Sequence, residues 1–117
     1  MPWTVLFDAV FLDEYGEMPQ EVQDALLATV VVLRELGPQM GRPHADTLNG
    51  SAYSNMKELR FNADDGVWRA AFAFDPKQQA IVLVCADKAG ENQKTFYKTL
   101  IKTADVRYGA HLARLKA

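Results

Sequence analysis

The sequence has 117 residues, 49% of them hydrophobic, and we expect residues 1–117 to form one domain with its own core. Its one cysteine, Cys85, lies in an apolar stretch, which excludes a disulfide framework and a zinc site built on paired cysteines. The apolar run at residues 25–33 is too short to cross a bilayer, and Asp8 and Asp13 near the start are not typical of a signal peptide. We therefore expect a cytoplasmic protein with no membrane segment.

Charge is divided unevenly along the chain, although the formal net charge is only −2. Residues 1–87 contain 6 Lys/Arg and 13 Asp/Glu, whereas residues 88–117 contain 7 and 2. The basic end is suited to an acidic partner such as RNA, and it is equally suited to pairing with the acidic part of the same chain. Charge alone does not choose between these alternatives.

The N-terminal half predicts a strand, a helix and an irregular segment. Residues 3–12 are rich in strand formers and are expected to pair with strands further along the chain. A helix that covers the sheet is predicted from Pro19 to Leu36, because its apolar residues follow helical spacing and a Gly-Pro pair ends it. Residues 38–55 are irregular, and we expect them at the rim of a binding site. His44 lies there without a second histidine nearby, so we propose no metal site.

Residues 56–87 predict a three-stranded antiparallel meander, with reversals at Asp64-Asp65-Gly66 and Asp75-Pro76-Lys77. Matching large apolar residues across the reversals fixes the register, because a slip of one residue would turn every side chain to the wrong face. The expected pairs are Leu59 with Phe72, Phe61 with Ala70, Phe72 with Leu83, Ala70 with Cys85, and Arg69 with Ala86.

Alternation along these strands assigns their side chains to two faces. The core face is expected to carry Leu59, Phe61, Trp68, Phe72, Phe74, Ile81 and Leu83. The other face is expected to carry Glu58, Arg60, Arg69, Ala71, Ala73, Val82, Val84 and Ala86. Two arginines and a glutamate therefore meet above small neighbours, which predicts a shallow basic site.

A final helix is predicted at residues 93–115, with a lysine at every fourth position along one side. These lysines are Lys94, Lys98 and Lys102. Such a row is usually a solvated face, but it is also placed to hold an RNA backbone if the helix begins beside the end of the third meander strand. His111 lies in the last turns and is expected to be structural.

The elements together predict the α+β class. We expect a two-layer domain in which an antiparallel sheet has helices packed mainly on one face, with a helix at the C-terminus. Part of the second face would then be open to a ligand.

The arginines of the second face need partners, because a desolvated guanidinium without an anion is costly. Glu58 and nearby acids are one possible set of partners for Arg60. Arg69 is expected opposite Ala86 and close to Lys88, away from obvious acids. Several cations converging in this way favour a phosphate ligand.

The order of short motifs resembles the RelE/ParE superfamily of bacterial toxins, and its phage-derived HigB-like branch in particular. The motifs are Met56-Lys57-Glu58-Leu59-Arg60, then Asp65-Gly66-Val67-Trp68-Arg69-Ala70-Ala71-Phe72, an apolar strand, and a final segment from Asp87-Lys88 to His111-Leu112. The resemblance implies a RelE-like fold and the toxin of a type II toxin-antitoxin system. It further implies an endoribonuclease that cuts mRNA on the ribosome and needs neither a metal nor a small-molecule cofactor.

In such cleavage the ribose 2′-hydroxyl attacks the adjacent phosphate, which requires a proton acceptor, cations and an acid near the leaving oxygen. The resemblance implies that Arg69 stabilises the phosphate, that Lys88 supplies another cation and that Tyr97 stacks on a base or helps in proton transfer. Arg60 lies on the matching first strand. The general base stays open, with Glu58 and Lys94 as the candidates to test.

The resemblance also implies partners, which are a helix-turn-helix antitoxin of the HigA type, the ribosome and mRNA. Two alternatives stay open. One is a ParE-like toxin that binds and inhibits DNA gyrase without chemistry of its own, and the other is a relative that retains only a binding role.

Overall fold

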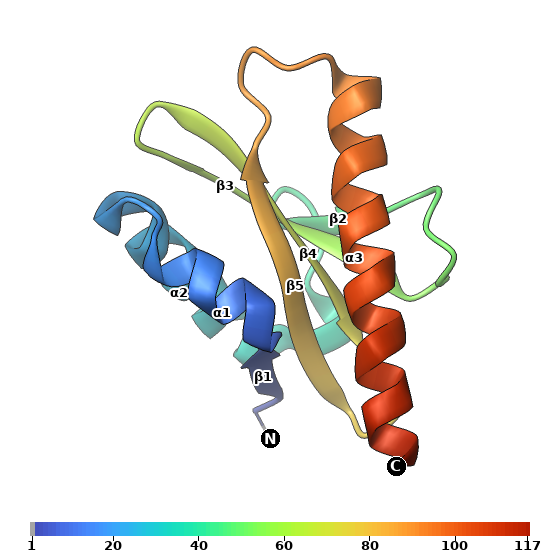
Figure 1. Ribbon diagram of the computed structural model, residues 1–117. Helices are drawn as coiled ribbons and strands as arrows, with labels where there is room; N and C mark the ends of the chain where they lie inside the picture. Colours follow the sequence, from blue (N-terminus) through green and yellow to red (C-terminus); the bar gives the residue numbers. More distant parts are fainter. Residues whose placement is uncertain (1) are drawn as a thin grey trace.

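The computed structural model describes residues 2–117, which form a five-stranded sheet flanked by helices (Figure 1). The order of the strands in the sheet is β1-β5-β4-β3-β2, with β1 parallel to β5 and the other neighbours antiparallel. The elements are β1 (Thr4–Phe7), α1 (Ala9–Gly16), α2 (Gln20–Leu36), the 3₁₀ turn η1 (Gly37–Gln39), β2 (Ala45–Thr47), β3 (Met56–Ala63), β4 (Gly66–Phe74), β5 (Gln79–Asp87) and α3 (Gln93–Lys116). The predicted α+β class, the meander and the C-terminal helix are confirmed.

The predicted strand at residues 3–12 is wrong beyond Phe7, where the chain turns into helix α1. Asp8 caps this helix, because its carboxylate accepts hydrogen bonds from the backbone N–H groups of Val10 and Phe11, both at 3.1 Å. Phe11 is completely buried. Capping therefore outweighs the strand propensity of these residues.

The register of the first hairpin differs from the prediction by two residues. Leu59 lies opposite Ala70, and Phe61 lies opposite Trp68. Asp64 and Asp65 have φ angles of 49° and 59°, so they alone form the reversal, as in a two-residue hairpin loop. A shift of two keeps every side chain on its predicted face.

A bulge between β4 and β5 changes the faces of the third meander strand. The pairs Ala70–Cys85 and Arg69–Ala86 are as predicted, but Phe72 lies opposite Val82 instead of Leu83. Beyond the bulge Ile81 and Leu83 therefore point toward α3, and Val82 points toward α1 and α2, which corrects their predicted assignment.

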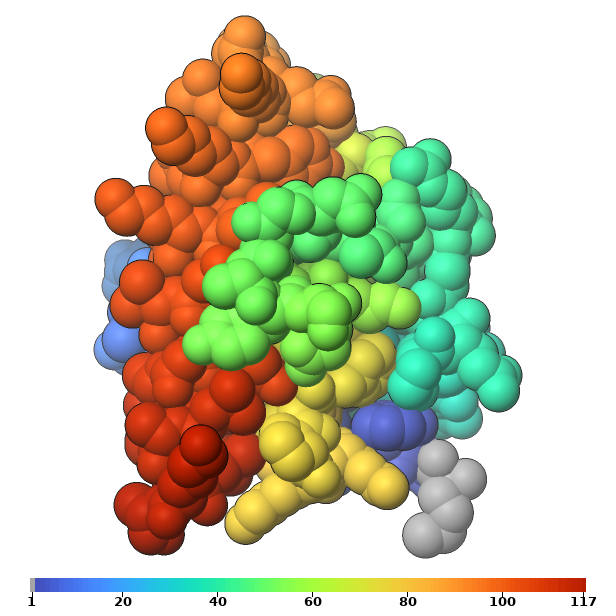
Figure 2. All heavy atoms as spheres, turned by 90° about the vertical axis from the view of Figure 1, so that its right-hand side faces the viewer, coloured from blue at the N-terminus to red at the C-terminus, as the bar shows by residue number. Residues whose placement is uncertain are grey.

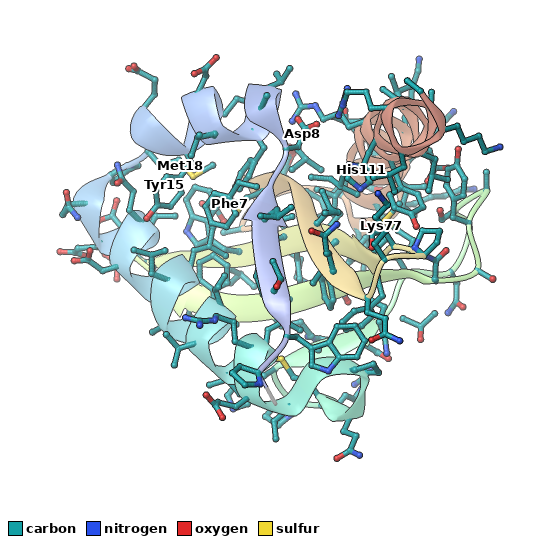
Figure 3. All side chains as sticks on the ribbon, turned by 90° about the horizontal axis from the view of Figure 1, so that it is seen from below. Phe7, Asp8, Tyr15, Met18, Lys77 and His111 are labelled. Atoms are coloured by element: carbon teal, nitrogen blue, oxygen red, sulfur yellow. The ribbon has the colours of Figure 1, made fainter. Side chains whose placement is uncertain are left out.

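The sheet separates two cores. Helices α1 and α2 pack on one face, so most of the helices share a face as expected. Figure 3 views this core from below, with Phe7, Tyr15 and Met18 pointing toward one another. The second face is less open than predicted, because α3 packs against it over Ala71 and Ala73. These small residues make room for the helix.

The far end of α3 is fixed to the turn between β4 and β5 (Figure 3). His111 Nε2 lies 2.8 Å from Asp75 Oδ2, whose side chain is fully buried. Burial raises the pKa of Asp75, but hydrogen bonds from His111, Gln79 and the backbone of Lys77 outweigh it and hold the pKa below its usual range. The structural role predicted for His111 agrees with this contact.

No helix among residues 2–117 is both long enough and apolar enough to cross a membrane.

Candidate functional site

Five predicted site residues meet at the end of the sheet next to the start of α3. Glu58 and Arg60 come from β3, Arg69 comes from β4, Lys88 from the loop after β5, and Tyr97 from the second turn of α3. Arg60 and Arg69 are direct cross-strand neighbours, and Glu58 lies two residues along β3 on the same face. The meander thus positions the two arginines and Glu58, and α3 places Tyr97 over them.

A hydrogen-bonded cluster of Glu58, Arg69 and Tyr97 forms the base of the site. The Tyr97 hydroxyl donates to Glu58 Oε1 at 2.8 Å and accepts from Arg69 Nε at 3.3 Å. Arg69 Nη1 also donates to the Trp68 carbonyl at 2.9 Å. Because the phenolic oxygen both donates and accepts, its proton is directed toward the carboxylate.

Arg69 is buried in this cluster, with only 5% of its surface exposed. Its Nε atom lies 3.7 Å from Glu58 Oε1, so the expectation that Arg69 has no acidic partner is wrong. The cross-strand shift of the first hairpin brings Glu58 opposite Ala71, two residues beyond Arg69 on β4. Arg69 therefore lies beneath the site, in contact with Glu58 and Tyr97.

Above this cluster lies an open, mainly polar pocket of about 390 Å³. Its cations are Arg42, Arg60 and Lys88, and its acids are Asp46 and Glu58. Arg60 Nη1 lies 3.7 Å from Glu58 Oε2 and 3.9 Å from Asp46 Oδ2, at the limit of an ion pair. Of the two arginines on the strands, Arg60 is therefore the one that is available to an anion in the pocket.

Arg42 also lines the pocket, although the sequence did not indicate it as a site residue. Its Nη2 and Nε atoms bind Asp46 Oδ2 at 2.7 and 2.9 Å, which holds an otherwise exposed side chain at the lip of the pocket. The hydrogen bonds from Thr47 N–H and Arg42 hold the pKa of Asp46 below its usual range. The only available signal was that Arg42 lies in the irregular segment predicted to form a rim.

Proton affinities in the pocket follow from burial and charge. Burial lowers the pKa of Lys88, and the nearby charges of Arg69 and Arg60 lower it further against the opposing effect of Glu58. Its Nζ atom lies 6.0 Å from the centre of the Tyr97 ring. Burial and the hydrogen bond to Glu58 raise the pKa of Tyr97, so its phenol stays protonated and remains a donor.

A second, larger hollow of about 830 Å³ continues from this pocket along α3. The two hollows share Tyr97, and the predicted lysine row lines the second one. This row consists of Lys94, Lys98 and Lys102. In Figure 2 the segment around residues 49–55, drawn in green, lies against the orange helix α3 and forms the opposite wall. The segment predicted as a rim thus lines both hollows.

Two other candidate groups lie outside the site. His44 is exposed in the loop before β2, and nowhere in the described part of the chain do three His, Cys, Asp or Glu side chains come together to hold a metal ion. Cys85 is buried, and burial together with Asp87 raises the pKa of its thiol to about 12. Such a thiol is inert.

Two solved structures share this architecture. The structure of a free mutant of the Escherichia coli toxin RelE covers 86% of this chain and 95% of its own, with a TM-score of 0.60 and 15% identity. The RelE–RelB complex from Pyrococcus horikoshii OT3 covers 77% of this chain and 99% of its own, with a TM-score of 0.55 and 15% identity. The protein thus has the RelE fold.

Sequence comparison identifies the family more closely. Residues 13–109 match the family described as "Phage derived protein Gp49-like". Two Mycobacterium tuberculosis (strain ATCC 25618 / H37Rv) proteins are similar. "Putative toxin HigB2" is 40% identical over 100 residues, which is 85% of this chain and 49% of that protein. "Putative toxin HigB3" is 42% identical over 88 residues, which is 75% of each.

The chain belongs to the Gp49-like, HigB-like family, as its motifs predicted, and it has the RelE fold. It spans about half the length of HigB2.

The burial of Arg69 and the exposure of Arg60 predict different effects on stability. Truncating Arg69 to Ala leaves the buried Glu58 carboxylate without its buried cation, so we expect a loss of about 3 kcal/mol in the free energy of unfolding. Truncating Arg60, whose side chain is more exposed, is expected to cost less than about 1 kcal/mol. Urea unfolding of the two variants measures the difference, and equal losses would contradict the assignment of Arg69 to the interior.

Proposed function

We propose that this protein is the toxin of a type II toxin-antitoxin system and that it inhibits translation by cutting mRNA on the ribosome. One observation carries the proposal, namely that Arg60 and Lys88 converge on a pocket whose base presents the hydroxyl of Tyr97. Family membership supports the same conclusion. Translating ribosomes place the site of action in the cytoplasm.

The pocket contains a group for each step of cleavage. The RNA 2′-oxygen forms a bond to phosphorus and gives its proton to Glu58, while the bond from phosphorus to the 5′-oxygen breaks. Arg60 stabilises the charge on the phosphorane oxygens, and the Tyr97 hydroxyl can turn its proton toward them once Glu58 has taken the proton of the 2′-hydroxyl. Lys88 donates a proton to the departing 5′-oxygen, and its lowered pKa makes that donation easier. The products are a 2′,3′-cyclic phosphate and a 5′-hydroxyl.

Arg69 is a positioning residue in this scheme. It fixes the Tyr97 hydroxyl and neutralises part of the charge on Glu58 from below the pocket. Glu58 is a better base than Lys94, because Glu58 lines the pocket and Lys94 lines only the adjoining hollow.

A partner antitoxin of the helix-turn-helix, HigA-like type would keep this activity silent. The solved RelE–RelB complex supports a partner antitoxin, though not its helix-turn-helix type, since RelE has the same fold. The distribution of exposed apolar side chains also supports one, because among the described residues most of the large ones lie on α1 and α2, on the sheet face away from the pocket. These are Val10, Leu12, Leu27, Val31, Val32 and Leu36.

Expression of the protein without an antitoxin is expected to arrest growth, and Arg60→Ala is expected to relieve the arrest. Losing one cation from the phosphorane should slow cleavage by about 10²-fold or more. Mapping new mRNA 5′ ends after induction measures this cleavage directly. Lys116→Ala, which removes a cation at the far end of α3, should leave both arrest and cleavage unchanged.

Cuts phased with codons would support the nuclease. Intact messages together with accumulating double-strand breaks in DNA would contradict it and favour a ParE-like gyrase inhibitor.

The role of Lys88 predicts a change in the pH dependence of cleavage. Its pKa lies below that of an ordinary lysine, so the wild-type rate should begin to fall on the alkaline side below about pH 10.4 as the donor loses its proton. Lys88→Arg keeps the charge but holds its proton at every accessible pH, so the alkaline decline should disappear while the rate drops by about 10²-fold. Single-turnover cleavage of ribosome-bound mRNA between about pH 7 and 10 measures this. An unchanged alkaline decline in Lys88→Arg would rule out Lys88 as the acid.

A further inference from the structure

The larger hollow beside the cleavage pocket has a different chemical character. The cleavage pocket is lined mainly by polar groups, whereas the larger hollow is lined mainly by apolar surface with lysines along it. An anionic linkage suits the first kind of lining, and the flat apolar face of a nucleobase suits the second. The two hollows meet at the Tyr97 ring, so neighbouring parts of one ligand can occupy both.

Two parallel rows of side chains on α3 produce this lining. Tyr97, Ile101 and Asp105 form one row at intervals of four residues, and the first two are half-buried against the core. The lysine row runs beside it at the same interval. Four residues of helix rise by about 6 Å, which is close to the spacing of successive phosphates along an extended single strand. The helix therefore offers apolar contacts and cations in step with bases and phosphates.

The opposite wall of the hollow is held in place by hydrogen bonds to α3. Asp105 accepts from Ser51 Oγ at 2.5 Å and from the Ala52 N–H at 2.9 Å. Gly50 has a φ of +99° and approaches Ile101, whose Cδ1 atom would lie 3.8 Å from a Cβ at that position. Hydrogen bonds thus hold this wall against α3, and the hollow between the wall and the helix is a groove.

We propose that this groove binds an unpaired RNA strand, with bases on Tyr97 and Ile101 and phosphates on the lysine row, and that it does so without the ribosome. The proposal rests on the proposed ribonuclease function for the identity of the strand, which continues from the linkage held at Arg60 and Lys88. The lysines along the groove supply charge complementarity for a polyanion. A duplex has its bases paired and stacked inside, so it cannot place them on Ile101 and Tyr97.

The direct test is binding of a fluorescein-labelled RNA hexamer in which every 2′-oxygen is methylated. This strand lacks the attacking hydroxyl, so binding is measured separately from cleavage. Fluorescence anisotropy should show saturable binding at least tenfold tighter for the single strand than for the same strand annealed to its complement. Lys98→Glu/Lys102→Glu should weaken binding of the single strand by tenfold or more.

The matched control is Lys77→Glu/Lys116→Glu, which makes the same charge change at the opposite end of the molecule. Lys77 lies in the turn between β4 and β5, at the C-terminal end of α3 (Figures 1 and 3). This control should change binding by less than threefold. Equal weakening by both double variants would mean that net charge alone attracts the strand, and this result would overturn the proposal that RNA binds in the groove.

Asp105→Ala separates a shaped groove from a basic surface. The substitution removes a negative charge, so binding by charge alone would become tighter. It also removes the hydrogen bonds that hold the wall against α3, so binding of the hexamer should weaken by threefold or more. Tighter binding overturns the proposal, and so does absence of hexamer binding by the wild type, which would leave the groove to a protein partner. If the hexamer binds and ribosome-bound mRNA stays intact, the groove stands and the ribonuclease assignment fails.

Discussion

The buried carboxylate of Glu58 is the group on which the arrangement of the site depends. It accepts a hydrogen bond from the Tyr97 hydroxyl, lies 3.7 Å from both Arg69 Nε and Arg60 Nη1, and is almost fully buried. Arg60 and Arg69 are cross-strand neighbours, and their repulsion would be severe in a partly desolvated setting without this acid. One carboxylate thus allows two strands to bring their cations together, and it also fixes a residue of α3. The position of α3 and the charge of the pocket therefore both depend on Glu58.

The fold could be predicted wherever a local signal dominates. The Asp64-Asp65 reversal, the Gly-Pro end of α2 and the regular lysine row of α3 are such signals, and they predicted the meander and both long helices. Three features lacked one. The bulge after Ala71 interrupts an alternation that reads smoothly in the sequence, the Asp8 cap competes with good strand formers, and the helix that covers Ala71 and Ala73 comes from a distant part of the chain.

The sequence predicted which residues form the candidate site, but not which of them are buried and which reach the pocket. Alternation placed Glu58, Arg60 and Arg69 on one face, and the motif order added Lys88 and Tyr97. Which arginine reaches the pocket depends on the register of the first hairpin, and an error of two residues there hid the contact between Arg69 and Glu58. Arg42 was missed because its position depends on Asp46 and on the path of an irregular segment. A single exposed arginine carries no pattern of its own.

In the proposed function, these side chains drive attack by a ribose 2′-hydroxyl on its own phosphate. This step can be tested with purified ribosomes loaded with an mRNA that carries one deoxyribose on the 5′ side of the cleaved linkage, compared with the all-ribose message. Cleavage at that linkage should disappear, and the all-ribose fragments should end in a 2′,3′-cyclic phosphate and a 5′-hydroxyl. Undiminished cleavage beside the deoxyribose would rule out attack by the 2′-hydroxyl.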